Sequence, residues 1–118
     1  MTAPARARRW TAERLRGQLG SGSGAAQLID DALLCVSELV TNAVQAGCSA
    51  LRLELELDDA GVRLAVVDDA PGLPKPRRAG PGDRRGRGLP LVDALAGRWG
   101  VAPDGRGKAV WVELPRPV

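Results

Sequence analysis

The heptapeptide Glu38-Leu39-Val40-Thr41-Asn42-Ala43-Val44 lies inside the longest apolar-periodic segment of the chain, residues 25–46. Apolar side chains recur there every three or four residues, which predicts an amphipathic helix that stops at Gly47. The repeating positions are Ile29, Leu33, Val36, Val40 and Ala43, and Leu28, Ala32, Leu39 and Val44 widen the stripe. On this helix Glu38 and Asn42 are one turn apart on one face, at the rim of the apolar stripe.

Two strands are expected directly after this helix. Residues 51–57 read Leu-Arg-Leu-Glu-Leu-Glu-Leu, and this strict alternation predicts a strand with one buried face and one wet face. Residues 58–61 are turn formers, so residues 62–67 are expected to pair back on the first strand as a hairpin.

The remaining elements complete a two-layer unit. A first helix is expected over residues 9–19, with Thr11 as its N-cap. A short helix over residues 89–96 and two closing strands over residues 98–101 and 107–114 follow later in the chain. The predicted fold is an α/β (α+β) two-layer sandwich, with helices on one face of a mixed, mostly antiparallel sheet.

Size and composition narrow the class of protein. The chain has 118 residues, enough for one domain over residues 1–118 with a modest core. It has no apolar run of about eighteen residues and no apolar signal-peptide core, so neither a membrane span nor secretion is expected. Cys35 and Cys48 predict free thiols in a reducing cytoplasm, with Cys35 in the core. The chain has no histidine, which argues against zinc, a histidine acid or base, and a phospho-accepting histidine.

The net charge of +3 raises the question of nucleic-acid binding. Arginines gather in residues 6–16 and again in residues 77–87, and Trp10 is the one aromatic residue near either group. Nucleic-acid platforms usually interleave aromatic side chains with the positive charge. Direct binding to nucleic acid is therefore not expected.

Residues 70–88 have a composition unlike the rest of the chain. The segment holds five glycines, four prolines and five arginines, with almost no apolar side chain. It cannot bury a face, so a long exposed loop is expected. Loops of this length in a compact domain are often functional, which favours a lid over a site; a disordered insertion is the alternative.

Three polar blocks, taken in chain order, point to a nucleotide site. Asn42 offers a neutral oxygen to magnesium, and Glu38 could take a proton from a hydroxyl or water near a γ-phosphate. Asp68 follows an apolar strand and could accept a hydrogen bond from the exocyclic amine of adenine, while Gly72 would let the backbone approach a flat ring. Each of these residues alone is more often an ordinary surface or turn residue.

The third block is a glycine pair that opens the short helix. Gly86 and Gly88 would present backbone N–H groups and a helix N-terminus to an anion. Arg87 lies between them, and one or two of the neighbouring arginines could neutralise phosphate charge. A Gly-x-Gly pair is weak evidence on its own, so the order of the three blocks carries the prediction.

Together these blocks resemble the N-box and the two glycine boxes of the Bergerat-fold ATPases, the group of gyrase, Hsp90, histidine kinases and MutL. The matching stretches are Glu38-Leu39-Val40-Thr41-Asn42-Ala43-Val44, Asp68-Asp69-Ala70-Pro71-Gly72 and Gly86-Arg87-Gly88-Leu89-Pro90-Leu91-Val92. Within that group the chain looks most like the stand-alone anti-sigma-factor serine/threonine kinases. Trp99-Gly100 and residues 107–111 are also similar to that group.

The resemblance implies binding of ATP with Mg²⁺ and a lid over residues 70–88. It implies phosphorylation of a serine or threonine on an anti-anti-sigma partner and sequestration of a sigma factor. By the same resemblance Glu38 would be the catalytic base, Asn42 the magnesium ligand and Asp68 the adenine reader. Gly86, Gly88 and Leu89 would border the phosphates, and the chain could form a homodimer.

Several positions depart from the pattern of that group and keep alternatives open. Gln45 and Ala46 replace residues that are often basic or histidine, and Ala70 replaces a glycine. Ala109 stands where a threonine is often found near the adenine aspartate. A non-catalytic partner-binding module of the same fold is therefore the main alternative to a kinase. A histidine-kinase fragment is a third alternative, and the lack of recognisable dimerisation helices and of a phospho-accepting histidine argues against it.

Overall fold

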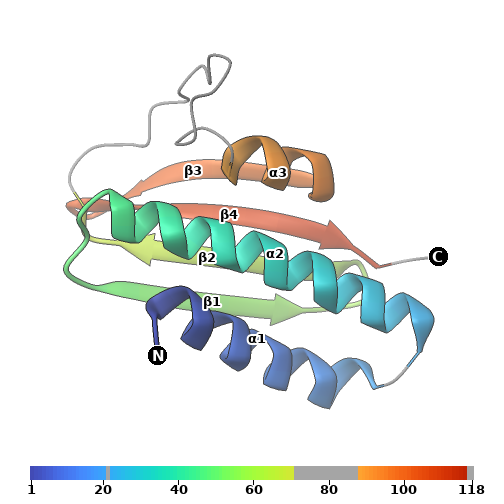
Figure 1. The fold of residues 1–118 in the computed structure, drawn as a ribbon. Helices are drawn as coiled ribbons and strands as arrows, with labels where there is room; N and C mark the ends of the chain where they lie inside the picture. The colour runs from blue at the N-terminus through green and yellow to red at the C-terminus, as the bar shows by residue number, and fades with distance from the viewer. Residues whose placement is uncertain (21, 71–87, 117–118) are drawn as a thin grey trace.

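The protein is described by a computed structural model that covers residues 1–20, 22–70 and 88–116. Two long helices come first, then a hairpin, a short third helix and two closing strands (Figure 1). In chain order the elements are α1 (Ala3–Leu19), α2 (Ser23–Gln45), β1 (Leu51–Leu57), β2 (Gly61–Asp68), α3 (Gly88–Leu95), β3 (Arg98–Asp104) and β4 (Gly107–Pro115).

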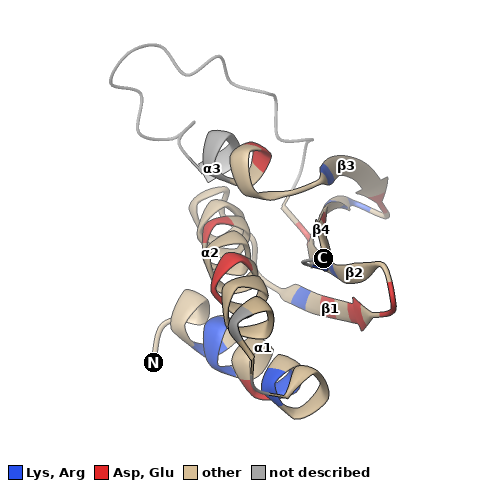
Figure 2. Cartoon of the chain, turned by 90° about the vertical axis from the view of Figure 1, so that its right-hand side faces the viewer, with Lys and Arg blue, Asp and Glu red and all other residues tan. Residues whose placement is uncertain are grey.

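The four strands form one sheet in the order β1-β2-β4-β3. All three pairings among the described strands are antiparallel. The three helices lie on one side of this sheet, so the molecule has a helix layer and a sheet layer (Figure 2). The expected two-layer sandwich with a mostly antiparallel sheet is confirmed.

The predicted apolar stripe of α2 forms the centre of the core. Val36, Val40 and Cys35 are fully buried, and they pack with Leu64 and Val112 of the sheet. The helix ends where the sequence predicts. Gly47 has a φ of 85°, and the N–H groups of Gly47 and Cys48 donate to the carbonyls of Val44 and Ala43 at 3.0 and 3.3 Å. This pair of hydrogen bonds is a Schellman motif, which satisfies carbonyls that a helix end leaves open.

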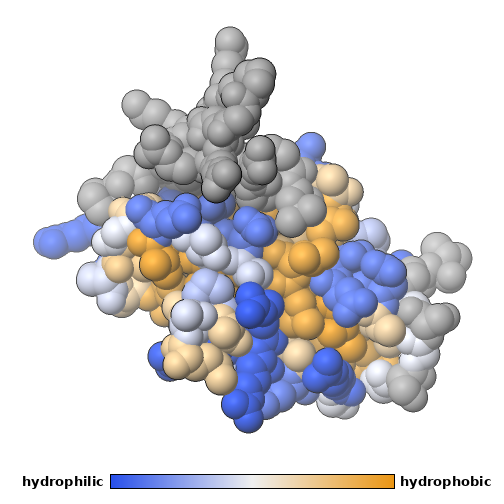
Figure 3. Space-filling view, viewed as in Figure 1, coloured by the Kyte–Doolittle hydropathy of each residue, from blue (hydrophilic) through white to orange (hydrophobic). Residues whose placement is uncertain are grey.

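Not every expected core position is buried. The Val44 side chain, which the predicted stripe included, is 48% exposed. Leu34, which was not part of the predicted stripe, is 47% exposed. Both belong to α2. Figure 3 shows apolar surface among hydrophilic patches on the face of the molecule that is turned to the viewer in Figure 1. Val44 lies in the last turn of α2 directly after the buried Ala43, so its side chain faces solvent at the edge of the stripe.

The first helix begins six residues earlier than expected. It starts at Ala3, where Thr2 is the N-cap and its hydroxyl accepts a hydrogen bond from the Ala5 N–H at 3.3 Å. The prediction of Thr11 as N-cap was wrong, because Thr11 lies in the middle of α1 and is fully buried against α2. Arg8 of α1 also donates to the Ser37 hydroxyl of α2 at 2.9 Å. These contacts fix the arginine-rich segment as helix.

Thr11 leads to the first stability prediction. Its Oγ1 is buried and has no hydrogen-bond partner among the described residues. A buried hydroxyl without a partner costs free energy, and valine has the same shape without the oxygen. We expect Thr11→Val to raise the free energy of unfolding by about 1 kcal/mol in urea denaturation. Thr11→Ala removes the methyl group as well and is expected to destabilise; a loss of stability in both variants would contradict the prediction.

The later elements lie close to their predicted places. β2 and β3 are longer than expected, and α3 begins one residue earlier, at Gly88. The Trp99 indole N–H donates to the Asp93 carboxylate at 2.9 Å, which ties β3 to α3. Most of the predicted lid, residues 71–87, lies outside the described residues. None of the described helices is long and apolar enough to cross a membrane.

Candidate functional site

The predicted acid and amide lie in the second half of α2. Glu38 and Asn42 are both half-buried, so each side chain keeps contact with solvent at the rim of the core. This position agrees with the expectation from the helical periodicity. Asn42 belongs to the last turn, and its backbone carbonyl accepts a hydrogen bond from the Ala46 N–H at 3.0 Å. The third helix packs on α2, which brings the start of α3 to the same part of the molecule (Figure 1).

Asp69, the residue after β2, forms hydrogen bonds with the loop that follows α2. The Asp69 carboxylate accepts hydrogen bonds from the backbone N–H groups of Ser49 and Ala50 at 2.8 and 3.1 Å, and from the Ser49 hydroxyl. The Asp69 N–H donates to the Ala50 carbonyl at 3.3 Å. The C-terminal end of α2 is thereby held next to the Asp68–Asp69 pair.

These hydrogen bonds predict an acid-sensitive contribution to stability. The Ser49 hydroxyl, with the N–H groups of Ala50 and Ser49, lowers the pKa of Asp69 below its usual value. Because the pKa of Asp69 is lower in the folded than in the unfolded protein, its ionised carboxylate stabilises the folded state. This stabilisation is complete above the unfolded-state pKa of about 4, and it is lost as the pH falls through the folded-state pKa. We expect Asp69→Asn to lower the thermal midpoint at pH 7, with the difference shrinking below about pH 4. Equal midpoints across the whole range would contradict this role.

The predicted base reader, Asp68, is buried at the end of β2. It is 5% exposed, and its Oδ1 accepts hydrogen bonds from the Ala70 N–H at 2.9 Å and from the Lys108 ammonium at 3.0 Å. The Lys108 and Asp68 side chains are 6% and 1% exposed, so the ion pair is buried. Two buried opposite charges stabilise each other only with good geometry and further hydrogen bonds, and the Ala70 N–H supplies one.

The structure corrects which residue of β4 faces Asp68. The sequence expectation placed Ala109 near this aspartate, but Lys108 is its partner in the β2–β4 register and Ala109 lies opposite Val67. Side chains alternate between the two faces of a strand, so Ala109 lies on the other face of the sheet. The signal was present in the alternation of Val110, Val112 and Leu114, which assigns Lys108 to the helix-covered face.

The structure describes only some of the residues of the two glycine boxes. Gly88 is the first residue of α3 and Leu89 the second, so the third block does open a helix, which begins one residue earlier than predicted. Gly72, Gly86 and Arg87 lie outside the described residues, together with most of the predicted lid. The structure therefore brings the end of α2, the end of β2 and the start of β4 together, with α3 packed beside α2.

The side chains at this place suit a magnesium ion that is shared with phosphates. Within the described residues, no group of three or more His, Cys, Asp or Glu side chains could hold a metal by itself. Magnesium usually keeps several waters and takes one or two protein oxygens together with substrate phosphates. The Asn42 carboxamide could provide one such oxygen, so the residues present fit an ion that arrives with a nucleotide.

Neither cysteine has the character of a nucleophile. Burial, with the negative charges of Asp31 and Glu38, raises the pKa of the Cys35 thiol to about 11. Burial also raises the pKa of Cys48, which lies in the loop after α2. The thiolate is the reactive form, so both thiols are unreactive at neutral pH. This agrees with the expectation of two free thiols with Cys35 in the core.

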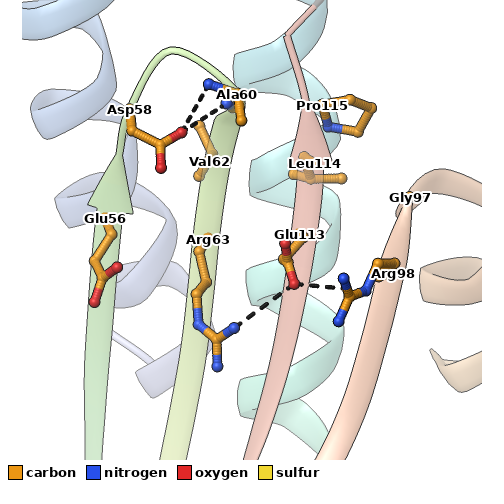
Figure 4. Close-up of a pocket in the computed structure, with 11 residues that line it drawn as sticks. Glu56, Asp58, Ala60, Val62, Arg63, Gly97, Arg98, Glu113, Leu114 and Pro115 are labelled. Atoms are coloured by element: carbon orange, nitrogen blue, oxygen red, sulfur yellow. Dashed lines mark hydrogen bonds and ion pairs between the residues drawn. The ribbon is translucent and has the colours of Figure 1, made fainter.

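A separate hollow of about 370 Å³ lies at the opposite end of the sheet (Figure 4). Its two arginines pair with Glu113, and its Asp58 accepts backbone hydrogen bonds. Glu113 lies 3.7 and 3.8 Å from Arg63 and Arg98, and the Asp58 carboxylate accepts from the N–H groups of Ala60 and Gly61. None of the sequence-predicted site residues lines this hollow, so it is distinct from the candidate nucleotide site.

Comparison with known families decides the class of this site. Residues 2–114 match the family described as histidine kinase-like ATPase domain. The chain belongs to this family. Its place among the ATP-binding, kinase-type domains confirms the Bergerat-fold resemblance, and the observed helix-on-sheet arrangement agrees with it.

Individual relatives support the fold over a large part of this histidine kinase-like ATPase domain. The histidine kinase domain of the Erythrobacter litoralis EL346 blue-light activated histidine kinase matches with a TM-score of 0.55 and 27% identity, covering 75% of this chain and 45% of that one. A second structure of that kinase matches with a TM-score of 0.57 and 22% identity, covering 90% and 39%.

One curated protein also matches this ATPase domain. It is an uncharacterized protein of Streptomyces coelicolor, 44% identical over 59 residues, which are 48% of this chain and 56% of that protein. The chain therefore spans about half the length of the relatives it matches.

Proposed function

We propose that this ATPase domain is an anti-sigma-factor serine/threonine kinase. It would bind ATP with Mg²⁺, phosphorylate a serine or threonine of an anti-anti-sigma partner in the cytoplasm, and sequester a sigma factor when that partner is absent. The observation that supports the proposal is that Glu38 and Asn42 are half-exposed on the second half of α2, and that the loop after this helix is hydrogen-bonded to Asp69, next to the buried Asp68. In this proposal Glu38 would be the general base, Asn42 an oxygen ligand of Mg²⁺ and Asp68 the carboxylate that recognises adenine.

Each residue has a distinct part in the proposed transfer. Asp68 would orient the nucleotide through its base, and Asn42 would hold an Mg²⁺ ion, which would reduce the charge on the phosphates. The partner hydroxyl oxygen bonds to the γ-phosphorus, the bond from that phosphorus to the β–γ bridging oxygen breaks, and ADP leaves. Glu38 takes the hydroxyl proton as the new bond forms.

A second candidate is a partner-binding module of the same fold without turnover. The observation that favours it is the Asp68–Lys108 pair, because the carboxylate expected to read adenine already has a buried cation at 3.0 Å. Gln45 and Ala46 at the end of α2 point the same way, since the kinase group often has basic or histidine side chains there. In this case partner regulation would not depend on Glu38.

Calorimetry of nucleotide binding tests the proposal. We expect the natural chain to bind ATP in the presence of Mg²⁺ and Asn42→Ala to lose the magnesium dependence, because the carboxamide oxygen is removed. Asn42→Asp keeps an oxygen at this place and serves as the matched variant. Absence of binding at millimolar ATP would contradict the kinase proposal for this chain and favour the partner-binding module.

A further inference from the structure

The Asp68–Lys108 ion pair places a hydrogen-bond donor beside an acceptor at the buried end of β2. The Lys108 ammonium lies 3.0 Å from Asp68 Oδ1, and the two side chains are 6% and 1% exposed. The residues are direct partners in the β2–β4 register. A Cβ on Gly107, the residue before Lys108, would overlap the Asp68 carbonyl, so a glycine is needed for this close approach. The backbone therefore fixes where the pair lies.

The described residues use only part of the hydrogen-bonding capacity of this pair. An ammonium has three donors, and Asp68 Oδ1 is the acceptor that the described residues provide for Lys108. A carboxylate has about four acceptor sites, and within the described residues the Ala70 N–H and the Lys108 ammonium fill two of them, both on Oδ1. Because the ammonium is buried, a ligand atom that accepts from it forms a charge-assisted hydrogen bond in a place with little water. The pair therefore suits a ligand edge that has a donor next to an acceptor.

Adenine has such an edge, formed by its 6-amine and the neighbouring ring nitrogen N1. The amine is a donor, and N1 carries no hydrogen and is an acceptor. Proteins that hold a base in a pocket commonly recognise it by hydrogen bonds to this edge. We propose that Lys108 is a second adenine-recognition residue of the ATP site: its ammonium donates to N1 while Asp68 accepts from the 6-amine. This inference rests on the proposed function, because it requires ATP to bind at Asp68.

The burial of Lys108 makes the contact with N1 important for affinity. A base that lies against the pair covers the ammonium, and buried donors left without an acceptor cost free energy. N1 provides that acceptor, and a charged donor makes a stronger hydrogen bond than a neutral hydroxyl or a water molecule does. The lysine therefore adds to the recognition of the base as well as neutralising Asp68. If the ion pair were only structural, replacing Lys108 would not change how far nucleotide affinity depends on N1.

The test compares Mg·ATP with Mg·1-deaza-ATP by calorimetry for the natural chain, Lys108→Met and Lys108→Arg. 1-Deaza-ATP has a C–H group in place of N1 and keeps the 6-amine, and Mg·7-deaza-ATP, which keeps the whole edge, is the matched control ligand. We expect the natural chain to bind 1-deaza-ATP about tenfold or more weakly than ATP, and to bind 7-deaza-ATP like ATP. Lys108→Met has a side chain of similar length without the charge, so it should bind ATP and 1-deaza-ATP with nearly equal affinity. Lys108→Arg keeps a charged donor opposite Asp68 and should keep the discrimination of the natural chain.

The outcomes separate this inference from the proposed function. Equal affinities of the natural chain for ATP and 1-deaza-ATP would overturn the role of Lys108 and leave ATP binding standing. Full discrimination by a folded Lys108→Met would also overturn it, since another group would then recognise N1. ATP binding by Lys108→Met alone would overturn it because the lysine would then block the site, and no ATP binding by any of the three proteins would overturn both proposals. If Lys108→Met does not fold, as judged by circular dichroism, the discrimination by the natural chain and by Lys108→Arg decides.

Discussion

Replacing Glu38 with glutamine is expected to lower the turnover of ATP by about 100-fold or more while leaving ATP affinity unchanged. Glutamine has nearly the shape of glutamate but cannot take a proton from the attacking hydroxyl. Glu38 is half-exposed at the rim of α2, so its loss leaves no cavity in the core. A residue that acts only as a base in the transition state lowers kcat without changing the binding of the nucleotide.

The measurement uses water as the acceptor, because a kinase base positioned for a hydroxyl also serves a water. ADP release from Mg·ATP is followed for the natural chain and for Glu38→Gln, and ATP affinity is measured by calorimetry. Asp30→Asn is the matched control: Asp30 is an exposed carboxylate on the same helix, about two turns earlier. Equal turnover in Glu38→Gln and the natural chain would refute the assignment of Glu38 as the base.

Gly107→Ala is expected to destabilise the protein by on the order of 3 kcal/mol. A Cβ at Gly107 would overlap the backbone carbonyl of Asp68, and the backbone atoms of Asp69 lie close as well. Neither neighbour is the flexible end of a side chain, so the β2 and β4 strands must move apart at this point. The shift would also move Asp68 from its present position, so nucleotide affinity should fall together with stability.

The control is Gly17→Ala in α1, where an added Cβ meets no atom within 4 Å. Alanine has a better helix propensity than glycine, so this variant should stabilise by roughly 0.5–1 kcal/mol. Urea denaturation gives both values on one scale. A Gly107→Ala variant as stable as the natural chain would show that the strands are not held closely together at the site.

Local patterns determined most of the elements. The stripe of α2 is repeated over several turns, and the alternation of residues 51–57 is strict, so each predicts its element without knowledge of any neighbour. Gly47 has the positive φ that the residue after a helix end often adopts, and glycine adopts it without steric strain. A glycine at this position therefore predicts where α2 ends. The order of the three polar blocks also depends on sequence alone, and it was enough to indicate the family.

Contacts between distant residues decided the rest. Thr11 resembles an N-cap by residue type, but packing against α2 made it an interior position of α1. The tie between Asp69 and Ser49 joins residues twenty positions apart, so no local pattern predicts it.

The same reason applies to the candidate site. The sequence determined that Asp68 ends a buried strand, but only the pairing of β2 with β4 decided that Lys108 faces it and that Ala109 does not. A shift of one residue in strand pairing exchanges the two faces, and the register is set by the whole sheet and its core. The sequence by itself therefore determined the class of the site, whereas the tertiary structure decided which side chain lies beside its carboxylate.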